Sequence, residues 1–182
     1  MLSPLFQGLV LGASMIIPIG AQNSHILNQG IKRNHHILAA TICMLCDVVL
    51  IAFGVFGGAK LIASSELLMT IITWGGVIFL FSYAALSFKS AWQNHYQHTY
   101  AGQAKDNRFA VVSTTFAVTL LNPHVYLDTV IILGSVGGQF TGHEKTVFAI
   151  GTVLASIIWF YSIANAAAKL SPWLNRPKTK RI

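Results

Sequence analysis

Five long apolar stretches fill most of this 182-residue chain. Each holds the roughly 20 residues that a helix needs to cross the hydrocarbon core of a bilayer. Only 9% of the residues are charged, against about 25% in a soluble domain. The chain has no room for a separate soluble domain, so we expect an all-α, polytopic membrane protein. The five predicted transmembrane helices are residues 4–27, 37–59, 67–88, 109–133 and 146–168.

The first apolar stretch is expected to be a retained span. No basic residue precedes it and no small-x-small cleavage site ends it, so it differs from a signal peptide. Cys43 and Cys46 are the only cysteines, and both lie inside the second predicted span. That placement excludes a framework of disulfides.

Basic residues are distributed unevenly between the two sides of the predicted membrane protein. Ten Lys and Arg residues fall on one side and two, Lys60 and Lys145, on the other. By the positive-inside rule the side with ten is cytoplasmic, which places the N-terminus outside and the C-terminal tail inside. The net charge of +7 then reflects topology and attraction to anionic lipid head groups, and not binding of nucleic acid. The ten residues are Lys32, Arg33, Lys89, Lys105, Arg108, Lys169, Arg176, Lys178, Lys180 and Arg181.

Two of the apolar stretches are interrupted at their middles by polar inserts that contain proline. Proline removes a backbone donor and leaves a carbonyl without its partner, which hydrocarbon cannot satisfy. Broken helices at membrane depth persist where they line a cavity, and paired breaks at corresponding places mark the substrate site of a transporter. Helix breaks are therefore predicted at Pro18, Gly20 and Pro123. The inserts are Pro18-Ile19-Gly20-Ala21-Gln22-Asn23 and Asn122-Pro123-His124-Val125-Tyr126-Leu127-Asp128.

The inserts belong to a weak internal repeat. A shift of 105 residues places Pro18 on Pro123 and Asn23 on Asp128, and a shift of 109 places residues 48–49 on 157–158. Because three spans separate the partners, the two halves would cross the membrane in opposite directions, as in many secondary transporters. We expect one transporter domain over residues 1–182, with a first repeat over 1–92 and an incomplete second repeat over 109–182. A sixth helix would begin near Arg176. Either the protein lacks it or this sequence stops short of it.

Asp47 and Asp128 are the acidic residues that fall within predicted spans. Asp47 lies one residue from the centre of the second span, where an aspartate costs about 2.5–3.5 kcal/mol on insertion scales. No Lys or Arg occurs in any predicted span, so a site for a cation or a proton is favoured over a structural ion pair. Asp128 lies five residues beyond Pro123. It is either a second carboxylate in the cavity or a solvated residue near a helix end.

The other candidate substrate ligands are polar residues of the inserts. Gln22 and Asn23 follow the first break, where a half-helix would restart, and the N-terminus of a helix attracts a carboxylate. Alternatively, their amides satisfy the backbone groups that the break leaves, without any ligand. Asn122 and Tyr126 are expected to line the path of the substrate beside Asp128.

Metal binding and enzymatic chemistry have little support in the sequence. Cys43 and Cys46 share a helix face and could hold a soft metal with the adjacent carboxylate, but buried cysteines are usually small apolar residues. His95 and His98 have ligand-like spacing in a polar loop without further ligands, and His25 is expected to be structural. No protease motif, Ser-His-Asp order or phosphate-binding glycine loop occurs. We therefore predict no metal, no cofactor and no enzyme activity.

Several runs of the chain resemble the lysine-exporter family of basic amino-acid exporters. The resemblance covers residue 1 to about residue 171. The family usually has proline where this chain has Ala21, and its members continue into one more hydrophobic segment after the basic tail. The runs are residues 18–23, Asp47, Thr73-Trp74-Gly75-Gly76, residues 122–129, and Leu133-Gly134-Ser135-Val136-Gly137-Gly138-Gln139.

The resemblance implies a secondary transporter that exports L-arginine across the bacterial inner membrane, with lysine and canavanine as further candidate substrates. Energy would come from the proton gradient or the membrane potential. The expected partners are the amino acid, protons, membrane lipids and further copies of the chain. Asp47 and then Asp128 would hold the side-chain cation, while the α-carboxylate would meet Gly20, Gln22 and Asn23. Two alternatives stay open: an exporter of another solute, such as a neutral amino acid or a divalent metal, and a truncated chain that inserts without transporting.

Overall fold

The computed structural model describes residues 3–58, 107–174 and parts of 64–85. Every regular element in these residues is a helix, which confirms the predicted all-α class. Two of the elements, η1 and η2, are π-helical stretches that continue α-helices. In chain order the elements are α1 (Pro4–Ile16), α2 (Ala21–Ile31), α3 (His36–Phe53), η1 (Gly54–Gly58), α6 (Arg108–Leu120), α7 (Pro123–Val125), η2 (Tyr126–Ile132), α8 (Leu133–Gly137) and α9 (Gly142–Leu174).

The described helices are long and apolar enough for a polytopic membrane protein. His36–Gly58 and Gly142–Pro172 could each cross a membrane alone, and two bent pairs could do so as single spans, giving up to four spans in the described residues. These four coincide with the first, second, fourth and fifth predicted spans. The third, residues 67–88, is described only in part, and His95, His98 and the start of the expected sixth helix lie outside the described residues.

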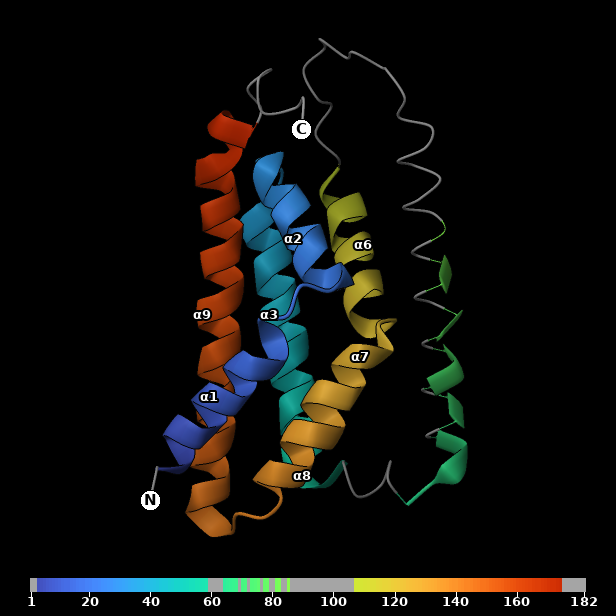
Figure 1. Ribbon diagram of the computed structural model, residues 1–182, viewed down its shortest axis with the longest axis vertical. Coiled ribbons are helices and arrows are strands. Elements are labelled where there is room, and N and C mark those ends of the chain that lie inside the picture. Colours follow the sequence, from blue (N-terminus) through green and yellow to red (C-terminus); the bar gives the residue numbers. More distant parts are fainter. Residues whose placement is uncertain are drawn as a thin grey trace.

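The two broken helices pack against the long helices α3 and α9 (Figure 1). α1 crosses α9 obliquely, and α2 then runs beside α9 and α3. α6 packs on α3, and the segment from α7 to α8 descends along α3 and η1. The end of α2, the starts of α3 and α6, and the end of α9 lie together at the upper end in Figure 1. The N-terminus and the start of α9 lie at the lower end.

α1 and α9 approach closely because both carry glycine at the contact. A Cβ atom at Gly8 would lie 2.1 Å from the Phe148 carbonyl oxygen, and one at Gly151 would lie 2.1 Å from the Leu5 carbonyl oxygen. Small residues permit such backbone contacts between membrane helices. This packing fixes the path of α1 into the first break.

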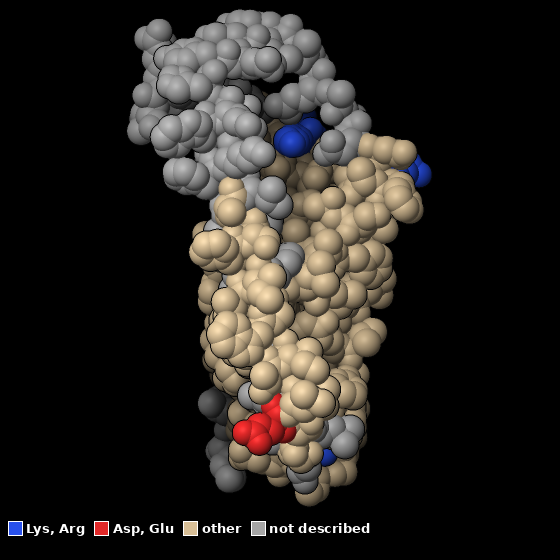
Figure 2. All heavy atoms as spheres, turned by 90° about the vertical axis from the view of Figure 1, so that its right-hand side faces the viewer, with Lys and Arg blue, Asp and Glu red and all other residues tan. Residues whose placement is uncertain are grey.

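The Lys and Arg side chains of the described residues lie at the ends of the molecule. Lys32 and Arg33 follow α2, Arg108 begins α6 and Lys169 lies near the end of α9. We call this upper end the basic end; Figure 2 shows basic side chains there, and acidic side chains with a basic one close by at the opposite end. The Arg33 Nε donates a hydrogen bond to the Ala168 carbonyl at 3.0 Å, which ties the turn after α2 to α9. Lys145 lies in the first turn of α9, at the opposite end. The other predicted basic residues lie outside the described residues: Lys60, Lys89, Lys105, Arg176, Lys178, Lys180 and Arg181.

Candidate functional site

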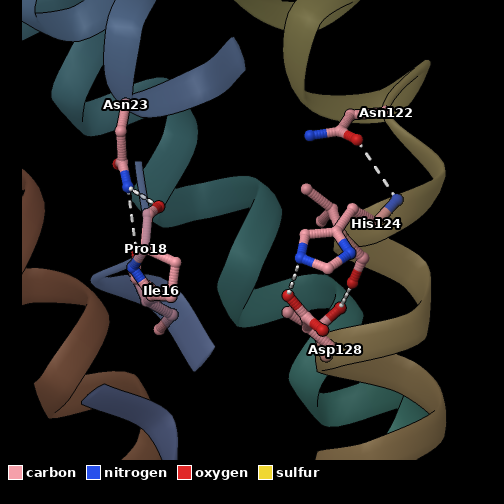
Figure 3. Close-up of polar contacts among 8 residues, drawn as sticks. Ile16, Pro18, Asn23, Asn122, His124 and Asp128 are labelled. Carbon is pink, nitrogen blue, oxygen red and sulfur yellow. Dashed lines mark hydrogen bonds and ion pairs between the residues drawn. The ribbon is translucent and has the colours of Figure 1, made fainter. Parts of the chain in front are cut away.

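The first helix break lies between α1 and α2, whose axes meet at 79°. The Asn23 side chain bridges it: Nδ2 donates to the Ile16 carbonyl at 2.9 Å and to the Pro18 carbonyl at 2.7 Å (Figure 3). Its Oδ1 accepts a hydrogen bond from the Trp159 indole at 3.2 Å. One buried amide therefore satisfies both carbonyls that the break leaves without a partner in the helix. In this conformation both N–H donors of the Asn23 amide bond to carbonyls of the break.

The second break separates α6 from the segment Pro123–Gly137, and here the bend is 56°. Pro123 occupies the first helical position, where a backbone N–H would have no partner within the helix, so its absence costs no hydrogen bond. Asn122 caps the helix, because its Oδ1 accepts from the His124 N–H at 3.1 Å. One turn further on, Asp128 Oδ2 lies 3.3 Å from His124 Nε2 (Figure 3). This spacing of four residues places both side chains on one helix face.

Asp47 is buried in the middle of α3, with 2% of its surface exposed. Its Oδ2 accepts a hydrogen bond from the Ser156 hydroxyl of α9 at 2.8 Å. Among the described residues, this carboxylate has no other hydrogen bond and no ion pair. A buried carboxylate with one neutral donor retains most of its capacity to accept hydrogen bonds.

A small cavity lies where the two breaks meet α3. Its volume is about 40 Å³, which holds water but is far below the roughly 300–1,000 Å³ of a typical small-molecule pocket. The structure therefore corresponds to a closed arrangement of this site. The cavity is lined by Met15, Ile16, Pro18, Gly20, Gln22, Asn23, Asp47, Asn122, His124, Val125, Asp128 and Thr129.

This cavity brings together five of the six predicted substrate ligands: Gln22, Asn23, Asp47, Asn122 and Asp128. Tyr126 is the exception, because it is not among the lining residues and packs against an apolar cluster of Leu50, Val125 and Val130. The reason is helical geometry. Residues two apart lie on different helix faces, so Tyr126 cannot share the face of Asp128.

The N-terminus of α2 opens onto the cavity without a side-chain cap. Gly20 holds the N-cap position and makes no capping hydrogen bond, whereas the second break is capped by Asn122. The Gln22 amide is buried in the first turn of α2, and its Nε2 makes no hydrogen bond of good geometry with the described residues. The Cys43 thiol of α3 lies within its reach. Uncapped N–H groups and an unused amide donor together favour an anionic ligand group here.

His124, Ser156 and Trp159 contribute to the site but were not singled out from the sequence. The spacing of His124 and Asp128 contained a usable signal, since residues four apart share a helix face. Ser156 lies 109 residues after Asp47, the same shift that aligns residues 48–49 with 157–158. Nothing in the sequence identified Trp159 as a donor to Asn23.

The two cysteines pack in the helix core. Both are free and buried, and Cys43 Sγ lies 3.5 Å from the Thr119 hydroxyl in a cluster that includes Ile26 and Phe160. Within the described residues, no group of three or more His, Cys, Asp or Glu side chains could hold a metal ion.

Helical spans, paired breaks and buried carboxylates are the features of a multi-pass membrane transporter. The family model described as LysE type translocator matches residues 13–182. The chain therefore belongs to the LysE type translocator family.

Relatives match over the whole chain. The protein YggA of Aeromonas salmonicida is 51% identical over 100% of this chain and 88% of its own length. The arginine exporter protein ArgO of Yersinia enterocolitica is 46% identical, and the protein of that name in Shigella flexneri is 47% identical. Both matches cover 100% of this chain, and 89% and 86% of the respective relatives. No solved structure matches the chain significantly.

Proposed function

We propose that this protein is a secondary transporter that exports L-arginine across the bacterial inner membrane, with lysine and canavanine as further candidate substrates. The observation that carries the proposal is the cavity at the two breaks, which both Asp47 and Asp128 line. None of its lining residues is Lys or Arg. The negative charge of the two carboxylates would therefore be neutralised by a substrate cation. The two relatives named as arginine exporters support arginine as that cation.

The side chain of arginine suits the two carboxylates. Its guanidinium is always charged and presents five N–H donors in a planar fork that pairs with carboxylate oxygens. Asp47 keeps acceptor capacity beyond its bond to Ser156, and Asp128 can exchange its contact with His124 for one with the substrate. A substrate cation would pass from Asp47 to Asp128.

The α-carboxylate of the substrate would bind at the N-terminus of α2. Gly20 leaves the first N–H groups of this helix without a side-chain cap, and the Gln22 amide lies beside them. Asn122 would line the path from the second break, and Asn23 would hold the first break in shape.

Export would proceed by alternating access. The cavity of about 40 Å³ must enlarge to admit an amino acid. The predicted inverted repeat of residues 1–92 and 109–182, the second incomplete, would supply two related parts that rock about the site. Proton uptake by one aspartate as the substrate leaves would couple export to the proton gradient. We place the basic end in the cytoplasm by the positive-inside rule, with the N-terminus in the periplasm.

The proposal is tested by the efflux of labelled arginine from preloaded cells that express this chain, with empty vector as the control. Efflux above the control that collapses on addition of a protonophore is expected. An excess of lysine or canavanine should compete, and a neutral amino acid should not. Efflux equal to the control, from protein detected in the membrane, would contradict the proposal.

Replacement of Asp47 by Asn then tests the site. The change keeps the size of the side chain and the contact with Ser156 while it removes the charge. Arginine efflux should be lost although the protein still accumulates in the membrane. Cys43→Ala and Cys46→Ala serve as matched changes on the same helix, and arginine efflux should survive both. Efflux that depends on the thiols would instead favour a soft metal as the substrate.

A further inference from the structure

A second group of buried polar residues extends from the cavity toward the basic end. Gln22, His25 and Gln29 follow one another along α2 at spacings of three and four residues, which place them on one helix face. All three are buried. α6 packs on this helix and presents Thr115 and Thr119, both 0% exposed. The group therefore lies between two helices and inside the protein.

The facing side chains of this group interact across the helices. His25 Nε2 lies 3.0 Å from the Thr115 hydroxyl. The Thr119 hydroxyl lies 3.5 Å from the Cys43 thiol, which also approaches Gln22 at the cavity. Polar contacts thus continue from the cavity to the middle of α6.

Nearer the basic end, Gln29 and Asn34 have buried amide atoms without a hydrogen-bond partner in the described part of the chain. Gln29 is 4% exposed and Asn34 2%, yet Gln29 Oε1 and both polar atoms of the Asn34 amide make no hydrogen bond with the described residues. A buried polar group without a partner costs about 1–3 kcal/mol. Such groups are few in native proteins and call for an explanation, such as water or a ligand. Here two of them lie at the outer end of a polar row.

The opposite half of the protein lacks a comparable row in the described residues. Below the cavity, Ile51, Val55, Leu133 and Phe148 form an apolar cluster. The buried Thr152 hydroxyl donates to the carbonyl of Phe148 in its own helix. Buried polar residues that could hydrogen-bond to a passing polar solute are therefore concentrated between the cavity and the basic end.

We infer that Gln22, His25 and Gln29 of α2, Thr115 and Thr119 of α6, and Asn34 form the passage between the basic end and the cavity, closed in this structure. The inference rests on the proposed function and deepens it. The occupant is the same cationic amino acid in transit. Its ammonium and guanidinium donors would pair with the Gln29 and Asn34 carbonyl oxygens, and its carboxylate with the Asn34 and Gln22 amide donors.

Accessibility of single cysteines tests the passage. The chain has two cysteines, and replacing both by Ser gives the background. In it, Thr115→Cys is compared with Thr114→Cys, its exposed neighbour, and Gln29→Cys with Asn28→Cys, also exposed. Lys32→Cys reports the side on which the basic end lies, and His143→Cys reports the other side. The probe is a water-soluble, cationic methanethiosulfonate applied to right-side-out and inside-out vesicles, since only a hydrated thiol ionises and reacts readily.

We expect Thr115→Cys and Gln29→Cys to react from the side at which Lys32→Cys reacts. Thr115→Cys should react several-fold faster than Thr114→Cys. An excess of arginine should slow both passage positions several-fold and leave Asn28→Cys unaffected. Two independent positions are used so that a variant that fails to insert does not decide the result.

The inference is overturned if both passage positions are inert, or if they react from the side of His143→Cys. It is also overturned if they react without protection by arginine, because the row would then carry water and not the solute. Arginine efflux by the background is measured in parallel. Efflux with inert passage positions contradicts this inference alone, whereas absence of efflux contradicts the proposed function and the inference together.

Discussion

Asp47 and Asp128 are two carboxylates in one cavity with different neighbours. Asp47 is deeply buried and is held by the Ser156 hydroxyl of another helix. Asp128 contacts His124 of its own helix, and the His124 side chain is 63% exposed. A carboxylate fixed by a neutral donor keeps one position, while one beside an exposed imidazole can exchange partners. Under the proposed function, this difference would suit Asp47 to the first contact with a cation and Asp128 to its release.

Ser156 is predicted to act as a positioning residue for Asp47. Ser156→Ala removes the hydroxyl that donates to Oδ2, and a hydrogen bond to a charged group contributes about 1.5–3 kcal/mol. The KM for arginine efflux should therefore rise by about ten-fold or more, with protein levels in the membrane unchanged. Ser162→Ala, at an exposed position of the same helix, is the control. An unchanged KM would show that Asp47 keeps its position without Ser156.

Asn23 decides between the two interpretations of the first insert. Asn23→Leu would leave the Ile16 and Pro18 carbonyls without their donor, at a cost of about 1–3 kcal/mol each. We expect a clear loss of thermal stability in detergent, measured by fluorescence-detected size exclusion. Ser24→Leu, at the exposed neighbouring position, should leave the melting temperature unchanged. Equal melting temperatures for the two variants would mean that the amide serves the substrate and not the break.

α1 and α9 approach closely at their glycines, and this contact predicts effects of different size for two glycines. A Cβ atom at Gly8 would meet the Phe148 carbonyl oxygen at 2.1 Å, whereas one at Gly20 would meet nothing within 4 Å. Gly8→Ala should therefore destabilise the protein by about 1–3 kcal/mol, although alanine favours helix. Gly20→Ala is compatible with its φ of −112°; because alanine is a poorer N-cap residue than glycine, it should cost at most about 1 kcal/mol. Thermal melts of both variants check this, and destabilisation of equal size would contradict the packing.

The apolar pattern predicted where helices run and where they bend, because both follow from what hydrocarbon excludes. Helices end at Ile16 and Leu120, beside the inserts that contain Pro18 and Pro123. The bend angles of 79° and 56° could not be predicted from this pattern, since they depend on tertiary packing. The sequence also predicted candidate substrate ligands, but not the side chains that hold them in place. Ser156 and Trp159 donate from α9, and the rotation of that helix about its axis is set by contacts such as Gly8 with Phe148.

The molecule as a whole combines a closed cavity with unused polar groups on one side of it. Asp47 retains acceptor capacity, and the Gln22, Gln29 and Asn34 amides have unused atoms in the described residues. Such groups raise the energy of the closed form. A ligand that satisfies them in an open form can therefore shift the balance between the forms through its own binding energy.

This balance predicts a selective stabilisation of the whole protein by its substrate. A ligand at 100 times its Kd stabilises a protein by about 2.7 kcal/mol, which corresponds to several degrees in melting temperature. L-arginine should raise the melting temperature of the detergent-solubilised protein. L-citrulline has the same length without the charge and should give little shift, because Asp47 and Asp128 would find no cation. Agmatine keeps the guanidinium without the α-carboxylate and should fall between the two, because the N-terminus of α2 would remain empty. Asp47→Asn should lose the response to arginine, and equal shifts with arginine and citrulline would contradict recognition of the cation by the carboxylates.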